Sequence, residues 1–194
     1  MSILSDSAIK KAVACGDIVI TPYKVDNVKS NSYDVTLSEN ILVYTGKVID
    51  LKESVIRDEG GLSHFEYNKI PITGGILNPN QKILAVTNEF VGTLKYRPCI
   101  NGKSGLGRCF LTIHQTAGYG DVGFGGHWTL EIIAHAPVII YPNMPIAQIE
   151  FQTVEGEVEK LYGANNVGNY MNKYSDDPMP QVSEYWRNFQ KGEV

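Results

Sequence analysis

Short runs of β-forming residues, separated by glycine, proline and asparagine, fill most of the chain between residues 17 and 153. Turn signals such as Gly74-Gly75 and Pro142-Asn143 recur between these runs. No helical pattern alternates with the runs, which argues against a doubly wound α/β fold. Many short strands at this spacing favour a sandwich or a closed barrel, and we therefore expect a mainly β fold.

Eight segments have the strand pattern. They are residues 17–21, 33–37, 41–44, 82–87, 109–115, 127–135, 138–141 and 146–153. The segment 127–135 is the clearest case, because apolar residues stand at every second position, as in a half-buried strand. Its predicted buried face holds Trp128, Leu130, Ile132 and Ala134, and its opposite face holds Thr129, Glu131 and Ile133.

The N-terminal segment has a different pattern. Residues 5–16 predict a short helix, in which Ser5 or Asp6 is the N-cap and Gly16 stands at the C-terminal cap position. We expect this helix and the strands that follow to belong to one domain over residues 1–194.

The C-terminal segment loses the strand pattern from residue 155 onward. Residues 163–172 are polar and rich in glycine and asparagine. We expect about residues 162–194 to form a flexible lid or arm that closes over a ligand, with a short helix near residues 184–189.

The composition restricts the partners and the compartment. A net charge of −4 provides no basic field for nucleic acid, and no apolar run reaches the length of a membrane span. The first residues lack the basic and then apolar order of a signal peptide. Cys15, Cys99 and Cys109 are scattered and odd in number, which is typical of reduced thiols in a cytoplasmic protein. We expect these cysteines to fill small spaces in the core.

A glycine-rich segment, NGKSGLGR, occupies residues 101–108. Glycine allows backbone N–H groups to approach an oxyanion, and Lys103, Ser104 and Arg108 add charged and neutral donors. The spacing differs from that of a Walker A loop, because no glycine stands five positions before Gly102. The segment is therefore either an anion-binding loop or a glycine-rich turn with two solvated cations.

Two carboxylates belong to the segment HQTAGYGDVGFGGHWTLE at residues 114–131. Asp121 lies in a turn of glycines and aromatic residues, and Glu131 lies in the following strand between Leu130 and Ile132. A carboxyl group with apolar neighbours is a candidate general acid and base. The alternative is that Glu131 lies on the solvent face of an alternating strand.

Together these segments resemble the dCTP deaminase and trimeric dUTPase superfamily. Residues 31–37 (NSYDVTL) are similar to its first conserved motif, and residues 102–108 are similar to its motif G-[RK]-S-S-x-x-R. Residues 116–131 resemble T-A-x-x-x-D-x-G-[FW]-x-G-x-x-x-L-E without a gap, and residues 145–148 (PIAQ) resemble a later motif that ends in glutamine. Residues 1–13 resemble the deaminase N-terminus, so the likeness covers nearly the whole chain.

The resemblance implies a fold, an assembly and a substrate. The fold would be a distorted, jelly-roll-like β-barrel of the dUTPase type, with the short N-terminal helix and the C-terminal lid. The chain would form a homotrimer with active sites at subunit interfaces. The substrates would be deoxycytidine and deoxyuridine triphosphates, with Mg²⁺ bound through the triphosphate rather than in a protein cage. No zinc would take part.

The resemblance also implies the role of each site residue. Glu131 would transfer protons as water adds to C4 of cytosine and ammonia leaves, with Ser104 positioning the water and Arg108 supporting Glu131. Asp121 would bind the deoxyribose 3′-hydroxyl and, in members that cleave dUTP, would act on the hydrolytic water. The base edge would meet backbone groups of Thr129 and Leu130. The phosphates would meet Lys103, Gly105, Leu106, Gly107, Gln148, Tyr162, Lys173 and Tyr174.

The chain departs from the family pattern at two places that concern the phosphates. The second serine of the glycine-rich motif is Gly105 here, so one hydroxyl donor is missing. In the tail, matching Lys173 and Tyr174 to the family's Lys-Tyr pair requires a short insertion after Tyr162. The glutamine expected four residues after that lysine is then Asp177, whose charge opposes a triphosphate.

Zinc-dependent cytidine deaminases are a weighed alternative. They use the motif H-x-E followed by P-C-x-x-C, and the chain contains His64-Phe65-Glu66 and Pro98-Cys99. The second cysteine is absent, because position 102 is glycine, so a zinc site cannot be completed.

Three functions remain open within the resemblance. The first is deamination of dCTP to dUTP and ammonia in pyrimidine deoxynucleotide metabolism. The second is a bifunctional enzyme that also cleaves dUTP to dUMP and diphosphate, which Gly118 favours, because it resembles the residue of bifunctional members at that position. The third is a non-catalytic nucleotide-sensing paralogue, against which the joint presence of Ser104, Arg108 and Glu131 argues.

Overall fold

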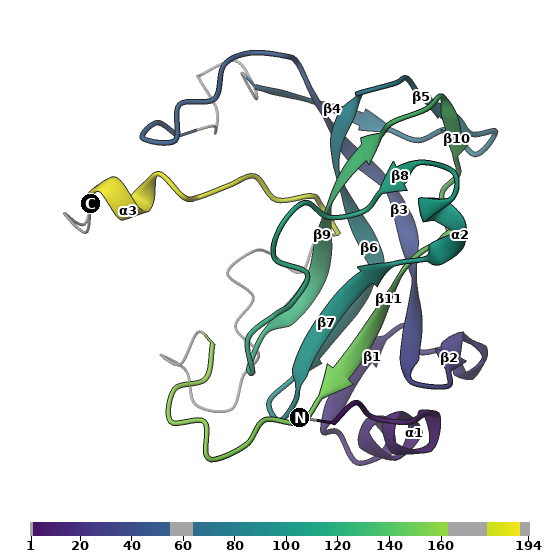
Figure 1. Cartoon of the computed structure of the whole chain (residues 1–194), viewed down its shortest axis with the longest axis vertical. Coiled ribbons are helices and arrows are strands. Elements are labelled where there is room, and N and C mark those ends of the chain that lie inside the picture. Colours follow the sequence, from purple (N-terminus) through teal and green to yellow (C-terminus); the bar gives the residue numbers. More distant parts are fainter. Residues whose placement is uncertain (1, 55–63, 163–177, 191–194) are drawn as a thin grey trace.

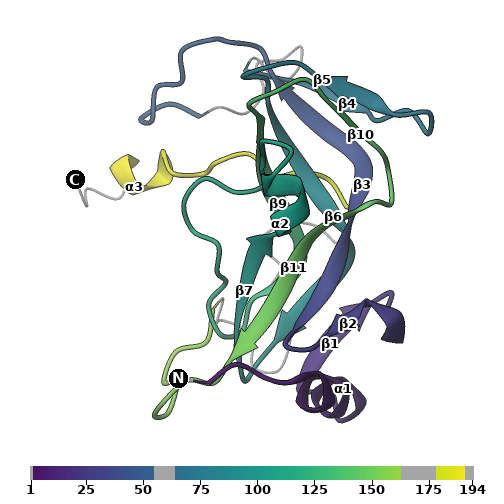
Figure 2. The same ribbon diagram turned by 45° about the vertical axis from the view of Figure 1, so that its right-hand side comes forward.

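A strongly twisted, nearly closed sheet dominates the structure (Figures 1 and 2). The chain is represented by a computed structural model that describes residues 2–54, 64–162 and 178–190. The strands of the main sheet are β1 (Ile18–Thr21), β2 (Val28–Lys29), β3 (Ser32–Tyr44), β4 (Phe65–Lys69), β6 (Lys82–Thr93), β7 (Arg97–Gly102), β8 (Leu111–Thr112), β9 (Gly125–Ala134) and β11 (Pro145–Gln152). The mainly β, barrel-like fold that the sequence predicts is confirmed.

The main path through this sheet has the order β7-β11-β3-β6-β9-β8, and β1, β2 and β4 pair at its sides. Two further strands, β5 (Gly75–Leu77) and β10 (Val138–Ile140), form a separate antiparallel pair. The helical elements are short. They are α1 (Asp6–Ala14), the 3-10 turn η1 (Val25–Asn27), α2 (Ser104–Gly107) and α3 (Arg187–Gln190).

Strand β6 changes its partner halfway along its length. Its first half pairs with β3 through residues 83–87, and its second half pairs with β1 through residues 90–93. The register with β9 shifts at the same place, between Val86 and Phe90. Such a bulge bends a strand and increases its twist, which allows a sheet to curl toward a barrel.

A buried carboxylate closes this bulge. Glu89 is only 2% exposed, and its two oxygens accept hydrogen bonds from the backbone N–H of Thr36, at 2.8 Å, and from the Thr36 hydroxyl, at 2.9 Å. The Thr87 hydroxyl donates to the Glu89 carbonyl and accepts from the N–H of Trp128. The bulge therefore ties together β3, β6 and the middle of β9.

Strand β9 follows the predicted alternation. Trp128, Leu130, Ile132 and Ala134 are buried in the core, whereas the residues between them are more accessible and Glu131 is exposed. Burying one face of a strand and exposing the other is the outcome that a period of two residues predicts. The chemistry assigned to β9 consequently lies on its outer face.

The N-terminal helix also agrees with the sequence pattern. Ser5 is its N-cap, and its hydroxyl accepts from the N–H of Ala8 at 3.4 Å. Gly16 follows the C-cap with a φ of +82°, a conformation that glycine adopts without strain. Ile9 and Ala12 pack into the core and attach the helix to the end of the barrel.

Several predicted boundaries are wrong. The segments 33–37 and 41–44 belong to one strand, β3, because a register shift lets pairing with β6 continue past residues 38–40. The segment 109–115 is mostly not a strand, because Phe110 has a φ of +60° and only the two residues of β8 pair. Strands β2, β4, β5 and β7, together with helix α2, are absent from the prediction.

The cysteines differ from the expectation of core filling. Only Cys99 is buried, and burial raises the pKa of its thiol. Cys15 and Cys109 are exposed, because each follows the end of a helix rather than occupying a core face. All three are free thiols. In the described part of the chain no helix is long and apolar enough to span a membrane.

The described part of the C-terminal segment lies against the barrel. The N–H of Gln181 donates to the Thr129 hydroxyl at 3.0 Å, and the Asn40 amide donates to the Pro178 carbonyl at 3.2 Å. The helix expected near residues 184–189 is the single turn of α3. Most of the predicted lid, with Lys173, Tyr174 and Asp177, lies outside the described residues.

Replacing Glu89 with alanine should lower the free energy of unfolding by about 1–3 kcal/mol, because the Thr36 N–H and hydroxyl lose a buried acceptor. Chemical denaturation would measure the change. The matched control is Glu39→Ala, on the same sheet, which removes only an exposed ion pair with Lys69 and should change stability by less than about 1 kcal/mol. Equal losses in the two variants would contradict a structural role for the bulge.

Candidate active site

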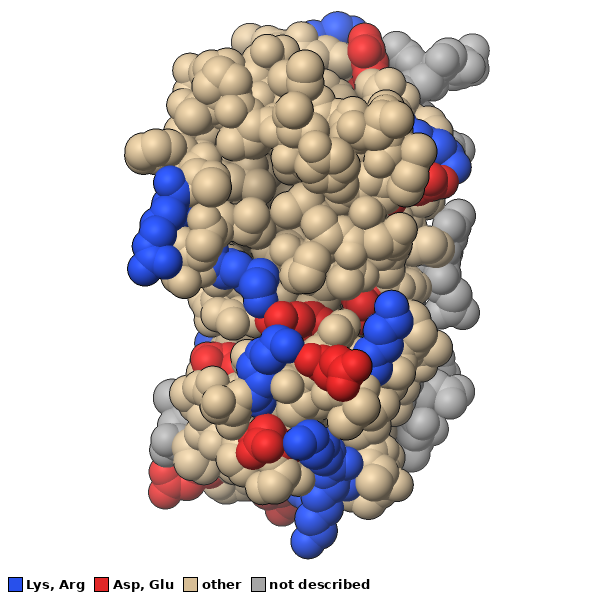
Figure 3. All heavy atoms as spheres, turned by 90° about the vertical axis from the view of Figure 1, so that its right-hand side faces the viewer, with Lys and Arg blue, Asp and Glu red and all other residues tan. Residues whose placement is uncertain are grey.

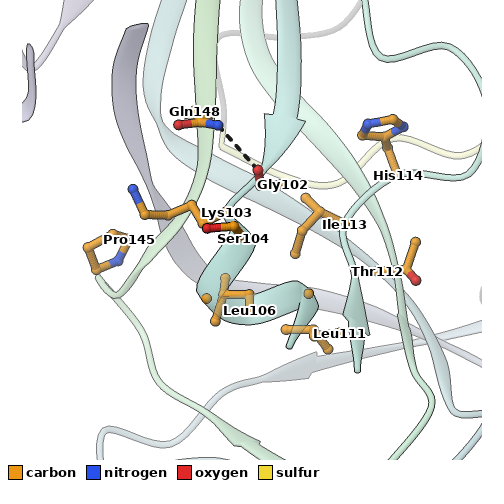
Figure 4. A pocket seen from close by; sticks show the side chains of 12 residues that line it. Gly102, Lys103, Ser104, Leu106, Leu111, Thr112, Ile113, His114, Pro145 and Gln148 are labelled. Atoms are coloured by element: carbon orange, nitrogen blue, oxygen red, sulfur yellow. Dashed lines mark hydrogen bonds between the residues drawn. The ribbon is translucent and has the colours of Figure 1, made fainter. Parts of the chain in front are cut away.

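The glycine-rich segment 101–108 forms the end of β7 and the single helical turn α2. A groove of about 860 Å³ opens beside this turn (Figure 4). Its lining combines the turn with residues of β8, of the segment after β8 and of β11. They are Gly102, Lys103, Ser104, Gly105, Leu106, Gly107, Leu111, Thr112, Ile113, His114, Pro145 and Gln148. Six of the predicted phosphate and water contacts are therefore gathered in one groove.

The glycines of this turn leave open space. A Cβ atom on Gly105 or Gly107 would meet no atom within 4 Å, and neither residue has a positive φ. The backbone at position 105 would therefore accept a residue other than glycine. Because the residue is glycine, the groove has no side-chain hydrogen-bond donor at this position. Arg108 follows as the C-cap of α2, is exposed, and does not line the groove.

Lys103 is held by a nearly buried carboxylate. Its Nζ lies 2.6 Å from Oδ1 of Asp34 on β3, and Nζ of Lys29 lies 3.7 Å from Oδ2 of the same side chain. Asp34 is 9% exposed and Lys103 is 28% exposed. An ammonium group has three N–H donors, so Lys103 keeps donors for a second anion while bound to Asp34.

Asp34 is a residue that sequence reasoning missed, although it belongs to the recognised segment 31–37. The signal was an acidic residue within an otherwise buried strand. Asp34 pairs in register with Gln148 on β11, whose amide donates to the Gly102 carbonyl at 3.4 Å (Figure 4). The lysine, the carboxylate and the glutamine therefore lie side by side next to α2.

A second cavity, of about 590 Å³, contains the other predicted residues. Asp121, Thr129, Glu131 and Tyr162 all line it. The lining also includes the aromatic residues Tyr119 and Phe124, together with Gln181, Val182 and Ser183 of the C-terminal segment. The side chain of Leu130 points into the core, so only its backbone is available.

Glu131 has different surroundings from those expected. Its sequence neighbours Leu130 and Ile132 point to the opposite face of β9, so the apolar flanks do not enclose the carboxylate. Instead, Oε2 of Glu131 accepts from the backbone N–H of Gln115 at 2.8 Å, and the Gln115 amide donates to the Glu131 carbonyl at 3.0 Å. Gln115 thus fixes one of the two carboxylate oxygens.

The loop before β9 is pressed against β7. The N–H of Ile100 donates to the Gly118 carbonyl at 2.6 Å. A Cβ atom at Gly118 would lie 2.8 Å from the Ile100 carbonyl oxygen and 3.0 Å from the ring of His114. A bare backbone at residue 118 is therefore a packing requirement of this loop.

The two halves of the predicted site do not meet within one chain. Ser104 and Lys103 line the groove beside α2, whereas Glu131 and Asp121 line the second cavity, and the two linings share no residue. Among the described residues no group of three or more His, Cys, Asp and Glu side chains is arranged to hold a metal ion.

Comparison with known proteins identifies relatives over nearly the full length. The family described as dCTP deaminase-like matches residues 3–154. A Clostridium botulinum (strain Eklund 17B / Type B) protein named "dCTP deaminase, dUMP-forming" is 40% identical over 189 residues, which cover 97% of this chain and 99% of the relative. A Cytophaga hutchinsonii protein of the same name is 35% identical over 190 residues, with the same coverage of both chains.

Among solved structures, a 2′-deoxycytidine 5′-triphosphate deaminase from Agrobacterium tumefaciens has a TM-score of 0.61 to this chain at 20% sequence identity. The match covers 78% of this chain and 48% of that one, so the chain spans about half the length of the solved protein. At this identity the likeness concerns the fold.

Gly118→Ala should destabilise the protein by about 1–3 kcal/mol, because the added methyl group overlaps the Ile100 carbonyl and the His114 ring. Gly105→Ala is the matched control, since its methyl group meets only open space and should leave stability unchanged or slightly raised. Chemical denaturation of both variants would measure the difference. A Gly118→Ala protein as stable as the control would show that the loop does not depend on this contact.

Proposed function

This chain belongs to the dCTP deaminase-like family, and we propose that it converts dCTP and water to dUTP and ammonia and then cleaves dUTP with a second water to dUMP and diphosphate. The name "dCTP deaminase, dUMP-forming" of its relatives supports this bifunctional reaction over release of dUTP as the product. The observation on which the proposal rests is the arrangement of Glu131, Thr129 and Asp121 along one cavity.

The base lies at the Glu131 end of the cavity in this proposal. Glu131 takes a proton from the water whose oxygen attacks C4 of cytosine, and it returns a proton to the amino nitrogen that leaves as ammonia. Gln115 acts as a positioning residue, because its N–H fixes one carboxylate oxygen and leaves the other for the water. This arrangement needs no metal at the reacting carbon.

In this proposal the hydrogen-bonding groups of the cytosine base contact backbone groups of β9 that are not paired with another strand. Backbone groups alternate between the two edges of a strand, so Thr129 presents its N–H and carbonyl on the same edge as Glu131. The Glu131 carbonyl on this edge accepts from the Gln115 side chain, whereas the Trp128 N–H on the opposite edge donates to Thr87 of β6, so we assign the backbone contact to Thr129 rather than to Leu130. Asp121, which lines the same cavity, accepts a hydrogen bond from the deoxyribose 3′-hydroxyl and orients the water that cleaves dUTP.

The substrate brings its own metal ion. Mg²⁺ prefers oxygen ligands and commonly binds through substrate phosphates, and the described residues offer no cage for it. Lys103 and Gln148 in the groove beside α2 of a neighbouring subunit supply contacts to the triphosphate, and Asp34 positions Lys103.

A homotrimer would unite the two halves of the site. Ser104, which positions the attacking water, is the first residue of α2 and does not line the cavity that contains Glu131, so the site needs Ser104 and Arg108 from a neighbouring subunit. Figure 3 supports an interface, because charged side chains are sparse at the centre of the upper half of this face. Exposed apolar residues of and around β5 and β10 include Ile72, Ile76, Ile139 and Tyr141.

The activity is tested by incubating the purified protein with dCTP and with dUTP and measuring ammonia and diphosphate separately. We expect both products, and Glu131→Gln should lower the rate of ammonia release by about 10²–10⁴-fold, because it removes proton transfer while keeping size and hydrogen bonding. Near wild-type deamination by the variant would overturn the role of Glu131. Ammonia without diphosphate would favour the dUTP-forming reaction.

The shared site is tested by co-expressing Glu131→Gln chains with Ser104→Ala chains that carry different tags. Random assembly of equal amounts should restore about a quarter of the sites, because only a Glu131 from one variant beside a Ser104 from the other is intact. Each variant expressed alone provides the baseline. A mixed assembly no more active than the two baselines would exclude sites shared between subunits.

A further inference from the structure

A third cavity, of about 480 Å³, lies beside the one that contains Glu131. Asp121 and Tyr162 line both cavities and so form their common wall. The remaining lining comes from the start of β7, the turn before β9 and the segment after β11. These residues are Arg97, Val122, Val154, Val158, Lys160 and Leu161. We call this space the Arg97 cavity.

Arg97 is held in place at the first residue of β7. One of its guanidinium nitrogens, Nη1, donates to Oε1 of Gln152 at 3.0 Å, and the two residues are partners in the β7–β11 register. The guanidinium carbon lies 4.0 Å from the ring centroid of Tyr119, in cation–π contact. A guanidinium group has five N–H donors, so this arrangement fixes the charge and leaves donors for a ligand.

Lys160 stands on a segment that is anchored to the turn before β9. The N–H of Tyr162 donates to the Val122 carbonyl at 2.8 Å. Gly123 has a φ of +102°, and a Cβ atom there would lie 2.9 Å from the Tyr162 nitrogen. The close backbone contact therefore brings residues 160–162 against Asp121 and places Lys160 at the cavity wall.

The side chains that line this cavity carry a net positive charge, whereas the whole chain carries a net negative charge. Arg97 and Lys160 outweigh Asp121, which leaves one excess positive charge in a protein of net charge −4. The other lining residues are valines, Leu161 and Tyr162. The glutamates of the neighbouring segment, Glu155, Glu157 and Glu159, are exposed and do not line the cavity. Two cations on a mostly apolar wall favour a multiply charged anion with oxygen acceptors.

We propose that Arg97 and Lys160 bind a polyphosphate in this cavity: the terminal phosphates of the bound nucleotide or the diphosphate that is released from it. The proposal rests on the proposed function for the position of the nucleoside. With the base at Glu131 and the sugar at Asp121, the chain of phosphates passes Tyr162 and enters the Arg97 cavity. The α2 turn has Gly105 where the family motif has a serine, so it lacks one hydroxyl donor to the phosphates. Arg97 and Lys160 supply additional hydrogen-bond donors to the phosphates.

The test uses the full chain and four variants: Arg97→Gln, Arg97→Lys, Lys160→Gln and Lys95→Gln. Lys95 is the matched control, because it is two residues from Arg97, is paired with Asp17 at 2.6 Å, and does not line the cavity. Calorimetric titration with inorganic diphosphate measures binding directly, and steady-state kinetics with dCTP measures KM and kcat. Thermal unfolding of each variant checks that the fold is retained.

We expect Arg97→Gln and Lys160→Gln each to weaken diphosphate binding by about tenfold or more, since each removes a charge-assisted hydrogen bond. Lys95→Gln should bind as the wild type does, and Arg97→Lys should recover part of the affinity. If the cavity holds the terminal phosphates of the substrate, KM for dCTP rises in parallel while kcat changes little. If it holds only released diphosphate, binding of diphosphate falls and KM for dCTP stays unchanged.

Unchanged diphosphate binding and unchanged KM in both glutamine variants would overturn the proposal. Lys160→Gln keeps the test decisive even if Arg97→Gln unfolds, because Lys160 is exposed and its loss removes no core contact. A wild-type protein that turns over neither dCTP nor dUTP would refute the proposed function alone. The diphosphate titration would still decide whether Arg97 and Lys160 form an anion site.

Discussion

The bulge at residues 87–89 of β6 sets the pairing of the strands around it. One strand has to pair with β3 over its first half and with β1 over its second half, and only an irregular backbone between the halves permits the exchange. An irregular backbone inside a barrel leaves polar groups without ladder partners. Glu89 and the Thr87 hydroxyl provide the missing partners, to Thr36 on one side and to Trp128 on the other. The carboxylate is therefore retained in the interior because the strand exchange requires it.

The position of β9 follows from this bulge, and the candidate site follows from β9. Because Trp128 and Leu130 are fixed inward, Thr129 and Glu131 must face outward, toward the cavity that the C-terminal segment partly covers. The loop before β9 is in turn pressed onto β7 through Gly118. The same β7 ends in α2, which carries Ser104 on a different surface. A single barrel thus presents two half-sites on separate surfaces, which is the geometric basis for proposing an active site shared between subunits.

Asp121 occupies the point at which the two cavities of the β9 side meet. Glu131, the proposed acid–base residue, and Thr129 line one of these cavities, and two cations line the other. A deoxynucleotide has the same sequence of chemical groups, with a base, a hydroxylated sugar and a charged phosphate chain. In the proposed arrangement Asp121, which lines both cavities, therefore meets the sugar, between the base in one cavity and the phosphates in the other.

Features that depend on local periodicity and on short motifs could be predicted from the amino-acid sequence alone. The alternation of β9, the capped helix that begins at Ser5 and the family resemblance of residues 102–108 and 116–131 could all be obtained from neighbouring residues, because each is a pattern within one segment. Only the tertiary structure decided which side chains meet across segments. Three contacts join residues from different segments of the chain. They are the ion pair of Lys103 with Asp34, the hydrogen bond from Gln115 to Glu131 and the hydrogen bond from Thr36 to Glu89 at the bulge. The apolar flanks of Glu131 misled the sequence argument for the same reason: adjacent residues in a strand face opposite sides, so the environment of a side chain is set by what packs against its face and not by its neighbours in sequence.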